Sequence, residues 1–292
     1  MHALTRQQLI LLVLLTLVWG INWPIMKFGV TGFPPLTFRT LCMWIGLPVL
    51  GAVLLWRRVP FRVGRAHWRE LALLTVFNMF FWHTLAILAI QTLSSGRAAI
   101  LGYTMPVFSA LVGAWWFGQR LQSRAWGGVA AAALGVVLLL WHEITSLSGK
   151  PLGVAMMLVA AATWAVGTQL MRRTRIPHPT LALSFWMTLF TALWMTLLAV
   201  LFERDAWVWP TPAIQAAIVY NAIGVFAFAQ VAWLMVARDL PPIASTLSVM
   251  FIPVLGVFSG AWWLGEVLHW QDWAAVALVM VAIATVLWPA RR

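Results

Sequence analysis

Long apolar runs separated by short polar stretches dominate this chain of 292 residues. A membrane-spanning helix needs about 20 mostly apolar residues, and ten runs are close to that length. The first run lacks a cleavage-like ending and is followed by nine others, so we interpret it as a retained helix rather than a removable signal. The pattern therefore predicts an all-α integral membrane protein with ten transmembrane helices. The expected spans are residues 9–27, 35–56, 71–91, 97–117, 125–141, 151–171, 180–202, 213–236, 242–264 and 272–288.

One short pattern occurs twice in the chain. The stretch GAWWFGQRL begins at Gly113, and GAWWLGEVL follows 147 residues later, an offset at which Pro106 also matches Pro253. Each half contains five spans, an odd number, so the second half should enter the membrane from the opposite side. We expect two inverted five-helix repeats, residues 1–145 and 146–292, an arrangement common among secondary transporters.

The composition supports a membrane location and orients the chain. Hydrophobic residues make up 63% and charged residues 9%, whereas soluble domains carry about 25% charged residues. The net charge of +12 comes from short basic bursts between apolar runs, which argues against a nucleic-acid partner. If the N-terminus is cytoplasmic, 14 Lys and Arg residues lie in loops and span ends on the cytoplasmic side and 4 on the other side. Arg39 lies within the second span and is not counted. This excess of positive charge on the inside is typical of membrane proteins. We expect both termini in the cytoplasm. The 17 Arg against 2 Lys suggest a bacterial origin and hence the inner membrane.

Aromatic and polar residues near mid-span are the first candidates for a binding site. Many of the 21 Trp residues mark span ends, where their rings anchor the helix at the interface. In the first span, by contrast, Trp19, Asn22 and Trp23 share one helix face, and Trp164 and Thr168 have matching places in the sixth. Such a face suits an amphipathic small molecule. The alternative is helix–helix packing with Asn and Thr as hydrogen-bonding groups.

Three further polar side chains lie near mid-span. Asn78 and His83 occupy the third span, and Gln230 lies 147 residues after His83 in the eighth. Buried polar groups in a membrane are costly unless they pair or meet water, so we expect these three to border a substrate cavity. His83 could respond to protons, or it could act as a neutral hydrogen-bonding group.

Two prolines predict places where a span can bend. Pro106 and Pro253 each remove one helical hydrogen bond and strain the carbonyl four residues earlier, at Gly102 in the first copy. Tyr103 is expected on the same face as this break, pointing at a cavity. Gly102, Pro106 and Pro253 are therefore candidate hinges, and a static kink that shapes packing is the alternative.

The absence of certain residues narrows the function. No Asp, Glu or Lys lies at a span centre. A proton relay built on carboxylates would need an acidic residue there, so the sequence argues against such a relay. A nucleotide or sugar-phosphate carrier should place several basic residues in its cavity, and only Arg39 is a candidate. No phosphate-binding loop, HExxH or GxSxG motif is present. We therefore predict no catalytic residues, no metal and no cofactor.

Two motifs together resemble a known family. The first span reads Trp19-Gly20-Ile21-Asn22 with a following Lys27, and the fourth and ninth spans close with the same Pro…Gly pattern. This duplicated set is similar to the EamA domains of the drug/metabolite transporter superfamily. One departure is Gln119, where the family usually has the Glu that the second copy keeps at Glu266. The resemblance implies ten helices around a central cavity and export from the cytoplasm.

Within that family, the chain looks most like bacterial exporters of aromatic and other neutral amino acids. The expected partners are a small-molecule substrate and the lipid bilayer, and the oligomeric state stays open, with a monomer compatible. The alternatives are a broad-specificity exporter of drugs or neutral metabolites, a channel, and a membrane-embedded enzyme. Chemical conversion of a substrate would identify the enzyme, and saturable flux that alternates sides would separate a carrier from a channel.

Overall fold

The computed structural model describes residues 5–119, 123–145, 151–232 and 242–287, and within these ranges all regular structure is helical, as expected. The α-helices are α1 (Arg6–Thr31), α2 (Pro35–Trp56), α3 (Trp68–Thr75), α4 (Phe81–Thr92), α5 (Ser95–Gly102), α6 (Met105–Phe117), α7 (Ser123–Thr145), α8 (Pro151–Met171), α9 (Thr180–Glu203), α10 (Pro212–Val219), α12 (Pro242–Leu264) and α13 (Trp270–Leu287). Two π-helical segments, η2 (Val76–Phe80) and η4 (Tyr220–Ala229), continue α3 and α10, and two short 3₁₀ turns are η1 (Arg65–His67) and η3 (Arg204–Ala206).

Helix length and composition bear on which helices can cross a membrane. Seven helical stretches in the described residues are long and apolar enough: Arg6–Thr31, Pro35–Trp56, Arg65–Thr92, Ser95–Phe117, Pro151–Met171, Thr180–Ala206 and Pro212–Ala232. The other three expected spans coincide with shorter apolar helices, Ser123–Leu139, Phe251–Leu264 and Trp270–Thr285. Every expected span thus has a helical counterpart, and seven are of membrane-spanning length.

Local sequence signals explain where several helices begin and end. Thr5 and Gln8 form a reciprocal capping box at the start of α1, and Ser94 caps α5 by accepting from the Arg97 amide. At the other end of the repeated motif, Gly118 and Gly265 adopt φ of 64° and 66°. Only glycine takes this left-handed conformation without strain, so both copies end their helix with the same turn.

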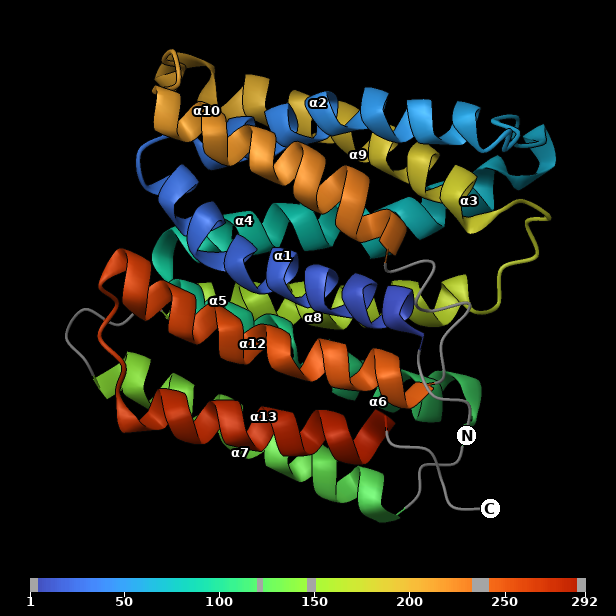
Figure 1. Ribbon diagram of the computed structural model, residues 1–292. Helices are drawn as coiled ribbons and strands as arrows, with labels where there is room; N and C mark the ends of the chain where they lie inside the picture. Colours follow the sequence, from blue (N-terminus) through green and yellow to red (C-terminus); the bar gives the residue numbers. More distant parts are fainter. Residues whose placement is uncertain (1–4, 120–122, 146–150, 233–241, 288–292) are drawn as a thin grey trace.

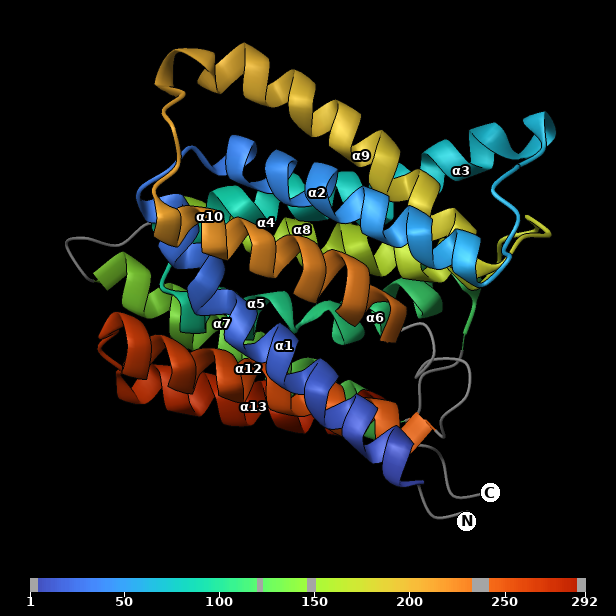
Figure 2. The same ribbon diagram turned by 45° about the horizontal axis from the view of Figure 1, so that its top comes forward.

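The helices pack side by side into one bundle (Figures 1 and 2). α7 and α13 lie together at one side, and α2 and α9 pack together at the other. Between them, α1 packs against α12, and α8 packs against α4, α5 and α6. The large hydrophobic core runs through the bundle, with buried residues from α1, α4, α5, α8 and α12 and also from α2, α9 and α13. The predicted site residues of α1, α4 and α8 lie on helices of this core.

The two ends of the bundle differ in charge. α1 begins and α13 ends at the same end, which we call the terminal end, and the opposite one the distal end (Figure 1). The basic residues at the ends of α2, α3 and α8 lie at the terminal end. The distal end holds few basic residues in the described chain, namely Lys27, Arg97 and Arg204.

The two candidate hinge regions differ in the structure. The expected span 97–117 is divided into α5 and α6, with Pro106 in the first turn of α6. At this break, the Leu101 carbonyl accepts from the Thr104 hydroxyl at 2.6 Å and from the Thr104 amide at 3.2 Å. α12, in contrast, is continuous through Pro253.

Candidate functional site

Aromatic side chains from three helices and the α5–α6 break meet in the interior. Trp23 on α1 is only 4% exposed and makes an edge-to-face contact with Tyr103, with ring centroids 6.3 Å apart. Trp82 on α4 meets Trp164 on α8 in the same manner at 5.3 Å. Gly102 lies between the pairs, since a Cβ there would come within 2.9 Å of the Trp23 ring and 3.3 Å of the Trp82 ring. We call Trp23, Trp82, Tyr103 and Trp164 the aromatic cluster.

Four buried polar atoms without a hydrogen-bond partner lie on the helices that carry the aromatic cluster or on helices next to them. Asn22 Oδ1, Arg39 Nε, Asn78 Nδ2 and His83 Nδ1 have no hydrogen-bond partner in the described part of the chain. A fifth such atom, Gln271 Oε1, lies at the start of α13. An unsatisfied polar group inside a membrane protein is costly, so these atoms are candidates for contact with a bound molecule.

The unpaired polar atoms adjoin the aromatic cluster along the chain. Asn22 precedes Trp23 on α1, and His83 follows Trp82 on α4. Asn78 on η2 lies against α8, because a Cβ on Gly167 would come within 2.7 Å of it. The structure therefore brings four helical elements of the predicted site together: α1, η2–α4, the α5–α6 break and α8.

Other predicted residues lie apart from this group. Trp19 packs against the core and also against a second hydrophobic group formed by α1 and the end of the η4 helix. Thr168 and Gln230 are half-buried, and no side-chain hydrogen bond joins them to the aromatic cluster in the described contacts. Gln230 follows directly after η4, and His83 instead meets Phe226 within η4, at 5.3 Å between ring centroids.

Gln169 and Arg39 are buried polar residues that the sequence analysis did not include in the predicted binding site. Gln169, next to Thr168, is fully buried: its Nε2 donates to the Ser109 carbonyl at 2.7 Å and its Oε1 accepts from Arg173 at 2.6 Å. It thereby ties α8 to α6. The second is Arg39, noted in the sequence only as a possible cavity cation, which is 3% exposed. A glutamine and an arginine inside apolar runs were the available signals.

A cavity of about 640 Å³ opens elsewhere, at the distal end between α2, α4 and α9. Its lining is mostly apolar and contains none of the predicted site residues, although Thr84 adjoins His83 in sequence. The lining residues are Pro34, Pro35, Leu36, Thr84, Leu88, Gln91, Leu198, Phe202, Glu203 and Ala206.

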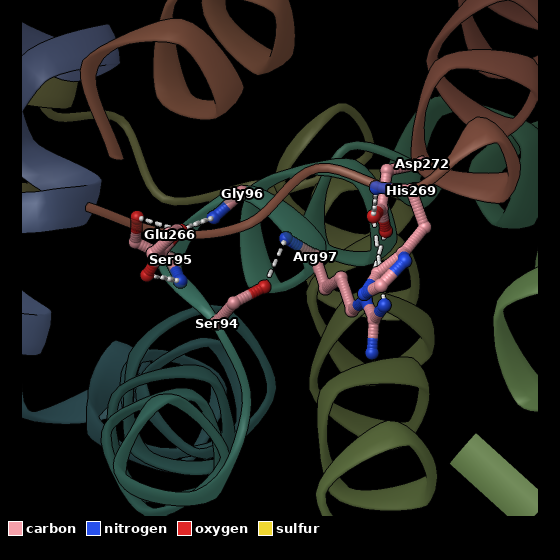
Figure 3. A network of polar contacts seen from close by, with 7 residues as sticks. All are labelled: Ser94, Ser95, Gly96, Arg97, Glu266, His269 and Asp272. Carbon is pink, nitrogen blue, oxygen red and sulfur yellow. Dashed lines mark hydrogen bonds and ion pairs between the residues drawn. The ribbon is translucent and has the colours of Figure 1, made fainter. Parts of the chain in front are cut away.

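Glu266 joins the two halves of the chain at the distal end (Figure 3). From the loop between α12 and α13, its carboxylate accepts from the Ser95 amide at 2.6 Å, the Gly96 amide at 3.2 Å and the Ser95 hydroxyl at 2.9 Å. These amides open α5 and lack partners within the helix. The carboxylate also lies at the positive end of the α5 dipole. It therefore stabilises the start of α5 both by hydrogen bonds and by its charge.

A buried ion pair lies beside Glu266 (Figure 3). Arg97 Nε donates to Asp272 Oδ1 at 2.8 Å, and the second oxygen of Asp272 accepts from the His269 amide at 2.8 Å. α5 is thus held to the start of α13 as well as to the end of α12. Gln119, which replaces the family's acid in the first copy, is exposed.

All five acidic side chains that the structure describes lie at helix ends. Glu203 accepts from the Leu36 and Thr37 amides at the start of α2, and Glu70 accepts from Thr174 and Arg175 after α8. Asp205 pairs with the adjacent Arg204 at the surface. In the described residues no group of three His, Cys, Asp or Glu side chains could hold a metal ion. The interior site therefore consists of aromatic rings, amides, one histidine and one arginine.

Helices long enough to span a membrane, packed into one bundle with unpaired polar groups inside it, are typical of polytopic membrane transporters. The chain belongs to the EamA-like transporter family, which it matches over residues 7–141 and again over 151–288. The resemblance seen in the motifs is thereby confirmed, and the protein is a membrane transporter.

Relatives and a solved structure agree with this assignment. The chain is 26% identical over 286 residues to "Uncharacterized inner membrane transporter YedA" of Escherichia coli K12, covering 95% of this chain and 91% of the relative. It is 25% identical over 292 residues to "Probable amino-acid metabolite efflux pump" of Salmonella typhimurium, covering 96% and 94%. A crystal structure of a protein with 22% identity superposes with a TM-score of 0.69 over 96% of both chains, which shows the same fold.

Proposed function

We propose that this transporter exports amino acids, aromatic and other neutral ones, from the cytoplasm by alternating access. The observation behind this proposal is the set of unpaired polar atoms on the helices of the aromatic cluster. A zwitterionic amino acid offers both a donor and an acceptor to such atoms, while its side chain can pack against Trp and Tyr rings. A purely apolar drug would leave the polar atoms unsatisfied.

The packing supports two inverted repeats, residues 1–145 and 146–292, around this site. α1 packs on α12, and its counterpart α8 packs on α5 and α6, the counterparts of α12. Likewise η4 packs on α2, and η2 packs on α9. Moving η2 forward by 147 residues places it at 223–227, inside η4. Corresponding helices thus make corresponding contacts, as a pseudo-two-fold axis requires.

The location and direction of transport are part of the proposal. The basic terminal end favours a cytoplasmic position for both termini, and a relative is named an inner membrane transporter. Another relative is named a probable amino-acid metabolite efflux pump. We therefore place the protein in a bacterial inner membrane, with export as its direction.

Counterflow in proteoliposomes tests the function. Vesicles preloaded with unlabelled phenylalanine or leucine should transiently accumulate in their lumen the labelled amino acid that is supplied outside, whereas protein-free vesicles should not. Asn22→Leu removes an acceptor that a substrate ammonium group would use, and it should weaken apparent affinity about tenfold. Gln271→Leu removes another buried, unpaired amide oxygen, on a half-buried residue at the distal start of α13, and should leave counterflow unchanged.

Two outcomes would contradict the proposal. If amino acids give no counterflow while apolar drugs do, the protein is a broad-specificity exporter. Equal losses in Asn22→Leu and Gln271→Leu would mean that the unpaired atoms have no special relation to the substrate.

A further inference from the structure

Arg39 is a buried cation in the interior of the bundle. It is the fifth residue of α2, about 6 Å along the helix from its distal start. Its side chain reaches α1, where Nη2 lies 2.6 Å from the sulfur of Met26, and η4, where Nη1 lies 3.5 Å from Asn221 Oδ1. The guanidinium carbon lies 5.8 Å from the centre of the Phe226 ring, and Nε has no partner.

These contacts do not balance the charge of Arg39. A thioether is a weak acceptor, and the bond to Asn221 is at the upper limit of hydrogen-bond length. The five acidic side chains described in the structure are all engaged at helix ends, and none of them forms an ion pair with Arg39; Glu203, at the start of α2, accepts from the Leu36 and Thr37 amides instead. A buried arginine normally faces an anion, because an unpaired buried charge costs several kcal/mol. Among the described side chains none supplies a counter-charge to Arg39, so an anionic group of a bound molecule would fit there.

We propose that Arg39 binds the carboxylate of the transported substrate, an inference that rests on the proposed amino-acid export. The guanidinium offers planar donors that match a carboxylate in geometry. Met26, which touches Arg39, lies one turn from Asn22 and Trp23 on α1, about 5 Å along the helix. A carboxylate at Arg39 would place an attached ammonium group near Asn22 Oδ1 and an attached ring toward the aromatic cluster.

The same arrangement defines the substrate class. A single guanidinium suits a monoanionic carboxylate, whereas a phosphate dianion is usually held by several cationic or amide donors. A cationic amine without a carboxylate would be repelled by Arg39. His83 contacts the same Phe226 ring as Arg39 and adds a polar atom, not a charged partner, to this part of the site. The preferred substrates are therefore amino acids and related apolar monocarboxylates.

The first test uses the wild-type protein and four matched ligands. Phenylalanine and phenylpropionate carry a carboxylate, while phenylalaninamide and phenethylamine carry the same ring without one. Ligand-induced thermal stabilisation in detergent should appear with the two carboxylates and be at least tenfold weaker in apparent affinity with the other two. Equal binding of all four would overturn the assignment of Arg39, because the carboxylate would then make no difference.

The second test changes the arginine itself. Arg39→Gln should weaken phenylalanine binding about 30-fold or more, as expected for a buried charge partner, and should not weaken the already weak binding of phenylalaninamide, from which it removes a repulsion. Arg39→Lys should retain part of the affinity. Arg204→Gln, a change at an exposed distal arginine, should have no effect. The ligand-free Arg39→Gln protein should melt at the same or a higher temperature than the wild type, because an uncompensated buried charge is removed.

The outcomes separate this inference from the proposed function. Transport of phenylalanine with unchanged affinity in Arg39→Gln would overturn the inference and leave amino-acid export standing. Arg39-dependent binding of phenylpropionate without phenylalanine would support the inference and contradict amino-acid export. Should Arg39→Gln lower the melting temperature and lose all ligands together, Arg39 would be structural, and the inference would be wrong.

Discussion

At the scale of the residue, tryptophan occupies two distinct environments in this protein. Trp262 in the second WW pair is 91% exposed on the bundle surface, where an amphipathic ring can sit at the lipid headgroups. Trp23 is almost fully buried, and Trp82 and Trp164 lie half-buried against each other. One residue type therefore occupies both the exposed helix ends and the aromatic cluster in the interior.

Trp164→Ala tests the role of the interior rings. Loss of a ring that packs on a substrate should cost about 1 kcal/mol or more, which weakens apparent substrate affinity at least about fivefold. Trp273→Ala is the matched control, since Trp273 is 44% exposed and packs on Phe258 at the surface. Affinities from concentration-dependent counterflow should differ between the two variants. Similar losses in both would show that Trp164 only supports packing.

At the scale of the element, helix ends are held by side chains from distant parts of the chain. Glu266 and Glu203 each accept from free amides at the start of another helix. Lys27 binds the opposite, C-terminal end of a helix: its ammonium group donates to the Ile90 and Gln91 carbonyls near the end of α4. These contacts match the sign of the helix dipole at each end. These contacts hold the end of one helix against a particular neighbouring segment. In the described chain the span centres carry no carboxylates.

Glu266→Ala tests this capping. It leaves the Ser95 and Gly96 amides without their acceptor, and the loss of a helix cap costs about 1 kcal/mol, with more expected for a charged, partly buried one. The melting temperature in detergent should fall by a few degrees. Gln119→Ala, at the equivalent and exposed position of the first copy, should change it far less. Equal shifts would mean that the turn, rather than the carboxylate, provides the stability.

At the scale of the whole molecule, the arrangement of charge bears on how transport is driven. The described carboxylates are all at helix ends, and His83 is the titratable histidine that faces the interior. Its Nδ1 lacks a partner, and its ring packs on Phe226. A neutral histidine suits these apolar surroundings, because protonation would place a second charge near Arg39, which contacts the same ring. We therefore expect a facilitator driven by the substrate gradient.

His83→Gln tests this energetic scheme, because glutamine can also donate and accept hydrogen bonds. Substrate exchange in proteoliposomes should fall by no more than a few-fold. Flux of a net-neutral substrate should respond equally little to an imposed pH gradient in the variant and the wild type. Uphill accumulation driven by a proton gradient, and lost in His83→Gln, would show instead that His83 carries the coupling proton.

Much of the molecule could be predicted from local sequence. The positions of the helical spans followed from hydropathy and length, and the family followed from two motifs repeated at one offset. Such features depend on residues that are near in sequence, so a single chain is enough to find them.

Only the tertiary structure decided which side chains meet. The rotation of each helix about its axis joined Trp82 to Trp164 and turned His83 toward Phe226 rather than Gln230. Packing also left Arg39 without a counter-charge from any described side chain. The two prolines illustrate the limit most directly: the same residue interrupts the span at Pro106 and lies within a continuous helix at Pro253. Neighbouring helices determine whether the freed backbone groups find other partners, and a local sequence does not specify those neighbours.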